Sequence, residues 1–237
     1  MTHHPLRRLA AATLLVAAGS AQAQVADRLL DGFDTGSGRV SANGLLPPDT
    51  LFAETTFAAS GAPGGARTLA VTPLRGTRAR LANTVADGSF LSFAEEGQHL
   101  YSSITYGQGS DLDLDLSNFT GLRLDGVHAT TPVKLVVYAY TDGGGASAAG
   151  IDLGGSMPAA SLSFASFFAN TESGVGVDWG NVDRLLFIFS GAETAVGTEV
   201  GADALWATAA VPEPGTYALL AGGLALVGWR VRRRAGT

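Results

Sequence analysis

The sequence predicts an all-β fold, a single antiparallel β-sandwich of the jelly-roll kind, and three observations support this. The chain has 32 glycines among 237 residues and only 15% charged residues, against about 7% glycine and about 25% charged residues in average soluble proteins. Short runs of alternating or β-branched residues recur, separated by glycine-rich turns. No sustained helical stripe occurs between residues 24 and 211. Helices are therefore expected only at the two ends, as a signal helix and a short transmembrane helix.

The absence of cysteine narrows the chemistry of the chain. Without thiols there is no disulfide framework, no thiolate zinc site, no iron–sulfur cluster and no cysteine nucleophile. The sequence predicts no cofactor and no metal site. Because the length suits one large domain, we expect residues 24–210 to form one sandwich between two targeting segments.

The first element is a secretory signal over residues 1–23. Arg7 and Arg8 give it a positive start, and residues 9–18 are an apolar stretch, too short to span a bilayer, which needs about 20 residues. A small-x-small cleavage site follows, and signal peptidase is the expected partner. The residues that define this site are Ala21, Ala23 and Gln24.

Strand-like segments then follow one another to residue 210. Residues 134–141 and 182–190 are apolar on nearly both faces, which predicts central strands of the sandwich. Glycine, proline and aspartate gather at predicted turns, among them 86–88, 141–145 and 154–155. The predicted strands are 51–58, 67–72, 80–85, 90–94, 100–106, 111–116, 122–124, 134–141, 151–153, 161–164, 182–190 and 204–208.

The tail, residues 211–237, has three parts in a fixed order. A proline-rich motif comes first, an apolar helix over 217–229 follows, and an arginine cluster over 230–234 ends it. Thirteen helical residues reach only about 20 Å, less than the roughly 30 Å hydrocarbon core, so the anchor is marginal. The arginines place the C-terminus in the cytoplasm and the body outside. The motif residues are Val211, Pro212, Glu213, Pro214 and Gly215, and the topology anchors are Arg230, Arg232, Arg233 and Arg234.

This tail resembles the PEP-CTERM sorting signal of Gram-negative bacteria that make extracellular polysaccharide. The resemblance implies an exosortase as partner, a membrane-embedded transpeptidase that cuts near the motif. It also implies transient residence in the inner membrane, with the body on the periplasmic side, before delivery to the cell surface or matrix. The two prolines support this reading, because they hold the motif extended and separate it from the helix. A permanent single-span anchor is the alternative.

The body is more acidic than the formal charge of −6 indicates. Two of the fifteen basic residues lie in the signal, and four basic residues and one acidic residue lie in the tail. Residues 24–211 therefore carry 9 basic and 20 acidic residues, a net charge of −11. Nucleic acid is excluded as a partner by this charge, and anionic lipid is disfavoured.

Parts of the body resemble carbohydrate-binding-module jelly rolls of the galactose-binding-like type. The resemblance rests on residues 31–34, on residues 163–167 with Trp179 and 181–183, and on a last strand that begins at Asp203. It implies that the first and last strands pair, and that exopolysaccharide is a partner. A structural calcium ion at Asp31, Asp34 and Asp203 stays an open alternative, because no complete set of oxygen ligands is apparent.

Alternating aspartates in the body resemble the start of an EF-hand loop. Asp111, Asp113 and Asp115 have the required spacing, but Leu116 and Leu122 stand where the loop needs glycine and glutamate. A solvated strand face is therefore predicted.

No catalytic residues are predicted. His99 and His128 are the only histidines outside the signal, and the nearest match to a G-x-S-x-G motif, residues 145–149, lacks its last glycine. Glu95 and Glu96 are adjacent, so on a strand they point to opposite faces and form no glycosidase pair.

Two further groups have alternative interpretations. Arg67, Arg75, Arg78 and Arg80 form the one basic cluster of the body, expected to pair with local carboxylates or to contact an anionic polysaccharide. The pairs Tyr138 and Tyr140, and Phe187 and Phe189, each share a strand face. Burial in the core is favoured for both pairs over a platform for sugar stacking.

The sequence thus predicts an exported, non-enzymatic surface or matrix protein. A glycan-binding module is the first alternative, and a polysaccharide hydrolase is the second.

Overall fold

The computed structural model describes residues 25–44, 53–72, 79–169, 174–192, 194 and 196–210. The predicted signal, processing motif and transmembrane helix lie outside these residues. Within them, no helix is long and apolar enough to cross a membrane.

The described residues form an all-β fold, as predicted. Its strands are β1 (Arg28–Asp31), β2 (Gly38–Gly44), β3 (Ala53–Ala58), β4 (Ala66–Val71), β5 (Ala79–Ala86), β6 (Ser89–Ala94), β7 (Leu100–Tyr106), β8 (Phe119–Thr141), β9 (Gly145–Ser163), β10 (Phe168–Ala169), β11 (Arg184–Gly191), β12 (Thr198–Ala202) and β13 (Ala204–Ala209). Two short 3₁₀ turns accompany them, η1 (Pro63–Gly65) and η2 (Phe164–Ser166).

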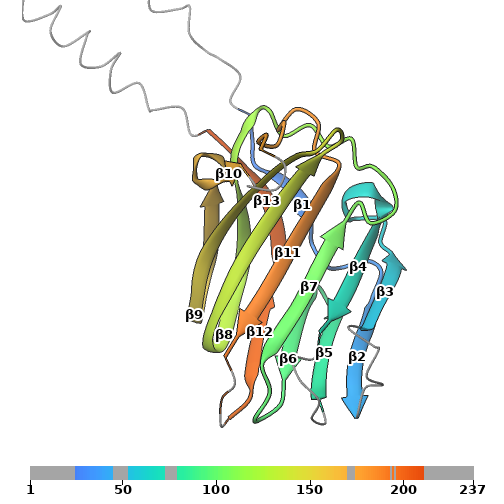
Figure 1. The fold of residues 1–237 in the computed structure, drawn as a ribbon, viewed down its shortest axis with the longest axis vertical. Helices are drawn as coiled ribbons and strands as arrows, with labels where there is room; N and C mark the ends of the chain where they lie inside the picture. The colour runs from blue at the N-terminus through green and yellow to red at the C-terminus, as the bar shows by residue number, and fades with distance from the viewer. Residues whose placement is uncertain are drawn as a thin grey trace, which may run out of the picture. The chain divides into compact units, whose positions relative to one another are not determined.

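The strands form two layers that share a long hairpin, β8–β9 (Figure 1). In the front layer the order is β9-β8-β11-β7-β4-β3, and in the back layer β13 and β12 lie beside β8, followed by β6, β5 and β2. The first half of β8 pairs with β13 and its second half with β11, with an irregularity between Ala129 and Val133. All pairings are antiparallel, and β1 pairs with β13, so the predicted pairing of first and last strands is confirmed.

The hydrophobic core lies between the two layers, and alternate residues of a strand point into it. In β11, Leu185, Phe187 and Phe189 are buried while the residues between them are half-exposed. The ring centroid of Phe189 lies 5.0 Å from that of Phe90 on β6, so aromatic side chains join front and back. The predicted core position of Phe187 and Phe189 is confirmed.

Two local predictions are wrong, and both errors have a backbone cause. Gly154 and Gly155 lie inside β9 and form no turn, because Gly155 has a φ of +65° and is absorbed as an irregularity of the strand. Residues 111–116 form an extended crossover whose single bridge joins Leu114 to Val182. The leucines of this segment turn inward and its aspartates are exposed, so the predicted solvated face is confirmed.

A buried ion pair joins β4 of the front layer to the last residue of β1. Asp31 and Arg67 are fully buried, and Arg67 donates from Nε and Nη2 to the two carboxylate oxygens at 3.0 and 2.7 Å. Tyr106 donates its hydroxyl to Asp31 at 2.8 Å, and the Phe33 amide donates at 2.8 Å. Burial and the adjacent charge raise the pKa of Tyr106 well above its usual value. Each polar group of this cluster is thus paired, as buried charges require.

The last residues of β13 are held by the start of the body. Asp27 accepts a hydrogen bond from the Ala209 amide at 2.9 Å and pairs with Arg123 at 2.7 Å. The Ala209 bond first, and the Arg123 bond second, lower the pKa of Asp27. We call these two contacts of Asp27 the clamp, because they hold the end of β13 in place.

The lowered pKa predicts how the clamp responds to pH. The charged form of Asp27 is favoured in the folded state, so its contribution to stability is present above the unfolded pKa of about 3.9 and is lost as pH falls through the folded pKa. Asp27→Asn should therefore be less stable than the wild type at pH 7, with the difference shrinking below about pH 4. Thermal unfolding from pH 2 to 7 measures this. A difference that stayed constant with pH would show that the charge of Asp27 contributes nothing.

Candidate functional site

The outer face of the front layer carries aromatic and aliphatic side chains that the core does not use. On β8 the residues that point outward include Tyr138 and Tyr140, because the alternating residues Val137 and Ala139 are buried. On the neighbouring β11, Arg184 lies opposite Tyr140 and Leu186 opposite Tyr138. All four outward side chains are half-buried. We call them the tyrosine face.

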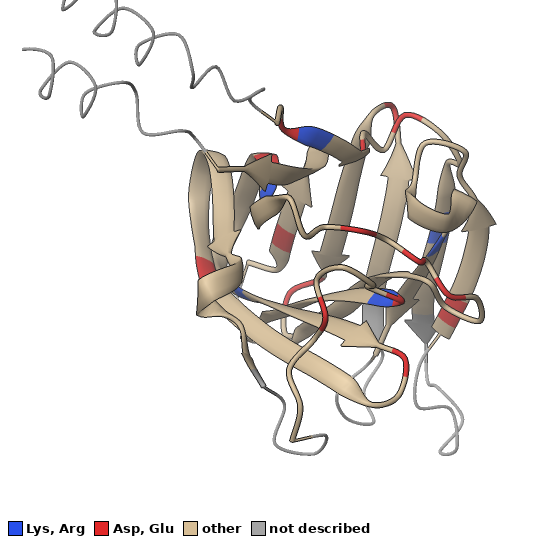
Figure 2. Cartoon of the chain, turned by 90° about the horizontal axis from the view of Figure 1, so that it is seen from above, with Lys and Arg blue, Asp and Glu red and all other residues tan. Residues whose placement is uncertain are grey.

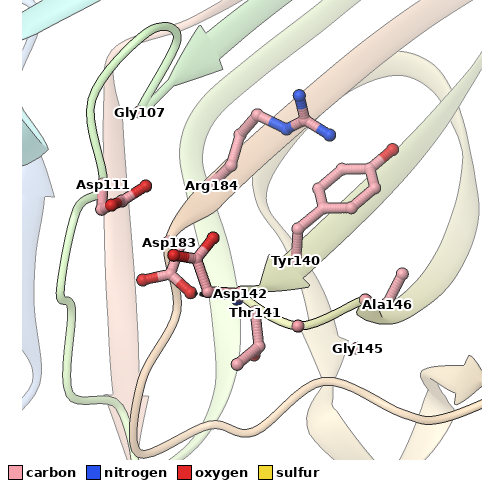
Figure 3. Close-up of a pocket in the computed structure, with 11 residues that line it drawn as sticks. Gly107, Asp111, Tyr140, Thr141, Asp142, Gly145, Ala146, Asp183 and Arg184 are labelled. Atoms are coloured by element: carbon pink, nitrogen blue, oxygen red, sulfur yellow. Dashed lines mark hydrogen bonds between the residues drawn. The ribbon is translucent and has the colours of Figure 1, made fainter.

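Ring stacking and a cation–π contact hold the side chains of Tyr138, Tyr140 and Arg184 against one another. The rings of Tyr138 and Tyr140 are nearly parallel, with an interplanar angle of 16° and centroids 6.2 Å apart. The Arg184 guanidinium carbon lies 4.0 Å from the centroid of Tyr140, a cation–π arrangement. Figure 3 shows both side chains projecting in the same direction from neighbouring strands. The Nε atom of Arg184 is buried and has no hydrogen-bond partner among the described residues.

A hollow of about 580 Å³ opens beside Tyr140 and Arg184, where the strand ends meet the loops. It is formed by the β8–β9 turn, the loop after β7 and the start of β11. Its size falls in the usual range of ligand pockets, about 300–1,000 Å³. The lining residues are Gly107, Asp111, Tyr140, Thr141, Asp142, Gly143, Gly144, Gly145, Ala146, Asp183 and Arg184.

Three carboxylates form one wall of the hollow, on the side away from the tyrosine ring (Figure 3). Asp183 is buried, accepts a hydrogen bond from the Asp142 amide, and donates its own amide to the Tyr140 carbonyl at 2.9 Å. The charge of Asp142, followed by desolvation and the charges of Asp183 and Asp113, raises the pKa of Asp111. The three neighbouring carboxylates make this wall acidic.

The hollow offers the groups that bind a sugar ring. The face of the Tyr140 ring that Arg184 does not cover can stack against the C–H face of a pyranose. Arg184 supplies donors, and the carboxylates supply acceptors for hydroxyl groups, with stronger hydrogen bonds than neutral groups make. No group of three or more His, Asp or Glu residues that is arranged to hold a metal ion occurs among the residues that the structure describes.

The structure separates most of the residues that the sequence singled out. Of the proposed calcium ligands, Asp31 is buried against Arg67, whereas Asp34 and Asp203 are exposed. Both carboxylate oxygens of Asp31 accept hydrogen bonds from Arg67, so they are already used in the ion pair. Glu95 and Glu96 directly follow β6, which ends at Ala94 as predicted, so neither of them lies on the strand.

The two histidines of the body and Arg67 of the basic cluster lie on different parts of the fold. His128 lies on β8 with its Nε2 atom 3.6 Å from Glu199, and His99 is exposed just before β7. Arg67 is fully buried and forms an ion pair with Asp31 at 2.7 Å, so for this residue the expected pairing with a local carboxylate is confirmed. Arg75, Arg78 and the side chain of Arg80 lie outside the described residues.

Sequence reasoning missed the composition of the hollow. The prediction that Tyr138 and Tyr140 are core residues is wrong, because both faces of this strand are apolar and periodicity alone does not tell which one turns inward. Asp142 and Arg184 were not singled out, and Asp183 was named only within the segment 181–183 that resembles a carbohydrate-binding module. Their position at predicted strand ends, next to a tyrosine, is the signal that points to them.

Comparison with known proteins identifies the tail. Residues 210–234 match the PEP-CTERM protein-sorting motif. No curated protein is significantly similar to the chain in sequence.

Solved structures similar to the body include the family 11 carbohydrate-binding module of the cellulase Lic26A-Cel5E of Clostridium thermocellum. That module is 14% identical, with a TM-score of 0.41 over 78% of this chain and 96% of the module. TmCBM61 in complex with β-1,4-galactotriose is 12% identical, with a TM-score of 0.29 over 72% of this chain and 88% of that one. An exo-β-agarase is 9% identical, with a TM-score of 0.40 over 79% of this chain and 26% of that one. The chain therefore carries a PEP-CTERM sorting motif at its C-terminal end, directly after an all-β body.

Proposed function

We propose that this is an exported surface or matrix protein of a Gram-negative bacterium, held briefly in the inner membrane and then processed at its tail by an exosortase. The observation that carries the proposal is the sorting motif at residues 210–234, which begins where β13 ends at Ala209. Signal peptidase acts on the other end, after Ala23. Arg230 and the three arginines after it hold the C-terminus in the cytoplasm.

Intact mass of the mature protein tests this processing. In a host that makes an exosortase, the wild type should lose its C-terminal segment after a bond within or near residues 211–215. Glu213→Ala should leave most of the protein at full tail length in the inner-membrane fraction, because the charged centre of the motif is gone. Glu54→Ala, on the exposed edge strand β3, is the matched control and should be processed normally. Wild-type protein that still ends at Thr237 outside the inner membrane contradicts the proposal.

A second function is supported by the tyrosine face. We propose that the body is a non-catalytic glycan-binding module, and that the hollow at Tyr140 and Arg184 receives a sugar. The stacked tyrosines, the adjacent guanidinium and the size of the hollow support this proposal. Matrix polysaccharide is then the partner of the exported body.

The acidic wall predicts which polysaccharides bind. Asp111, Asp142 and Asp183 repel the carboxylates of a uronic acid polymer and leave an uncharged sugar unaffected. At low ionic strength, neutral β-glucan and cationic chitosan should bind at least tenfold more tightly than alginate in calorimetry or affinity electrophoresis. The gap between chitosan and alginate should narrow with added salt. Alginate binding as tightly as β-glucan would contradict the prediction, and new reducing ends in the β-glucan sample would show that the body is a hydrolase.

A further inference from the structure

Phe168 on β10 is an aromatic residue that the core leaves largely open to solvent, at 65% exposure. The turn that carries it is well packed. The Phe167 ring meets Trp179 edge-on with centroids 5.0 Å apart, and the Phe167 amide donates to the Phe164 carbonyl at 3.1 Å. Phe164 stacks on Trp179 with centroids 3.7 Å apart. Because neighbouring residues of an extended chain point to opposite sides, Phe167 packs against the core and Phe168 faces outward.

Strand register places Phe168 on the same side of the sheet as the tyrosine face. Residues directly opposite each other on neighbouring antiparallel strands share a face. Phe168 lies opposite Ala148 on β9, and Ala148 lies opposite Tyr138 on β8. Leu186 continues this row on β11. Only the methyl group of Ala148 therefore stands between the two aromatic positions of the row.

The hollow borders the same part of β9. Its lining residue Ala146 lies opposite Tyr140, on the side away from Arg184 (Figure 3). The Ala146 amide donates to the Val175 carbonyl at 3.0 Å, and Val175 is 63% exposed. Two exposed apolar residues, Phe168 and Val175, thus lie beside β9 next to the hollow. The apolar surface is continuous with the site described above.

The hollow and the Phe168 surface differ in charge. The carboxylates of Asp111, Asp142 and Asp183 line the hollow, whereas residues 164–169 include no charged residue. Many of the body's acidic residues lie on loops, and long stretches of strand carry no charge (Figure 2). An uncharged ring binds by stacking and offers no ion pair. A ligand at Phe168 therefore presents a flat, uncharged face.

The positions of the two rings define the length of ligand that contacts both. Phe168 and Tyr140 are two strands apart and differ by one outward position along the strands. With strands about 4.8 Å apart and a rise of about 6.8 Å for two residues, their backbones are about 12 Å apart. An extended β-linked glycan advances by about one strand spacing per sugar unit. About two units therefore separate the sugars that the two rings contact.

We propose that Phe168 is a second stacking platform, and that the body holds a linear, uncharged β-linked glycan that runs from the hollow across β8 and β9 to β10. This inference rests on the proposed glycan binding and names the ligand class of that site. A disaccharide in the hollow is too short to reach Phe168. A chain of at least about four units contacts both rings.

Chain length separates the two platforms in an experiment. The full-length protein, in a nonionic detergent without a sugar headgroup, is titrated calorimetrically with β-1,4-glucan oligosaccharides of two and of six units. Phe168→Ala should weaken binding of the six-unit chain about tenfold, because one aromatic stacking contact is lost. It should leave the affinity for the two-unit chain unchanged. Because Phe168 is exposed, thermal unfolding should be nearly unchanged as well.

Three further variants show whether the flat ring is what binds. Phe168→Tyr keeps the ring and should bind the six-unit chain like the wild type. Phe168→Leu keeps an apolar side chain without a ring and should bind like Phe168→Ala. Val196→Ala, at an 81% exposed position just before β12, is the matched control and should bind both oligosaccharides like the wild type.

The possible results keep this inference apart from the glycan-binding function itself. Equal affinity of Phe168→Ala and the wild type for the six-unit chain would overturn the second platform and leave the hollow as the binding site. Sedimentation velocity tests a second copy of the chain as the occupant. Self-association that Phe168→Ala abolishes, with glycan affinity unchanged, would also overturn the inference. A wild type that binds neither oligosaccharide would instead overturn the proposed glycan binding.

Discussion

Arg67→Met is expected to lower the free energy of unfolding by about 3–5 kcal/mol, because it leaves the carboxylate of Asp31 buried without its counter-charge. Both side chains have 0% exposure, so water cannot replace the lost partner. Arg67 also donates to the carbonyl oxygens of Thr35 and Gly36, at 2.7 and 3.2 Å, and both carbonyls lose this donor when the ion pair is removed. Chemical denaturation at pH 7 measures the effect.

Two further variants separate the charge from the packing. Arg39→Met, on the exposed side of β2, should change the free energy of unfolding by less than about 0.5 kcal/mol. Asp31→Leu combined with Arg67→Met should be more stable than Arg67→Met alone, since no charge is then left unpaired. If Arg67→Met cost less than about 1 kcal/mol, the pair would not have the structural role assigned to it.

Tyr140→Ala is expected to weaken β-glucan binding about 30-fold, which corresponds to about 2 kcal/mol for the truncation of a central aromatic contact. The substitution removes the ring that a sugar would stack on, and it also removes the support of the Arg184 guanidinium 4.0 Å above it. Because Tyr140 is half-buried and points away from the core, the melting temperature should fall by only a few degrees. Calorimetric titration and thermal unfolding of the same samples separate these effects.

The matched control is Tyr101→Ala. Tyr101 lies on β7 opposite Ser190 in the same front layer, at the end of β11 away from Arg184. Its removal should leave glycan affinity unchanged. Arg184→Gln is a second probe of the hollow and should weaken binding by loss of charged donors while Tyr140 stays in place. Equal affinity of Tyr140→Ala and the wild type would place the binding surface elsewhere.

The strands were predictable wherever side-chain alternation was strong. The prediction for β7, residues 100–106, matches the structure at both ends, and the segments predicted at 134–141 and 182–190 fall on the neighbouring strands β8 and β11. β12 was missed because Thr198–Ala202 contains no clear alternation. β8 was predicted in pieces because its buried side shifts by one residue at Gly126, which has a φ of +63°, and a further irregularity follows between Ala129 and Val133.

The sequence by itself determined the sorting motif and the fold class, because both depend on local order: charge, apolar length and proline spacing in the tail, and strand periodicity in the body. Only the tertiary structure decided the site. It turned Tyr140 outward, committed Asp31 to Arg67, and brought Asp111, Asp142 and Asp183 from three separate loops to one wall. Such long-range pairings depend on strand register and on the packing of the two layers. The order of residues along the chain gives no direct indication of either.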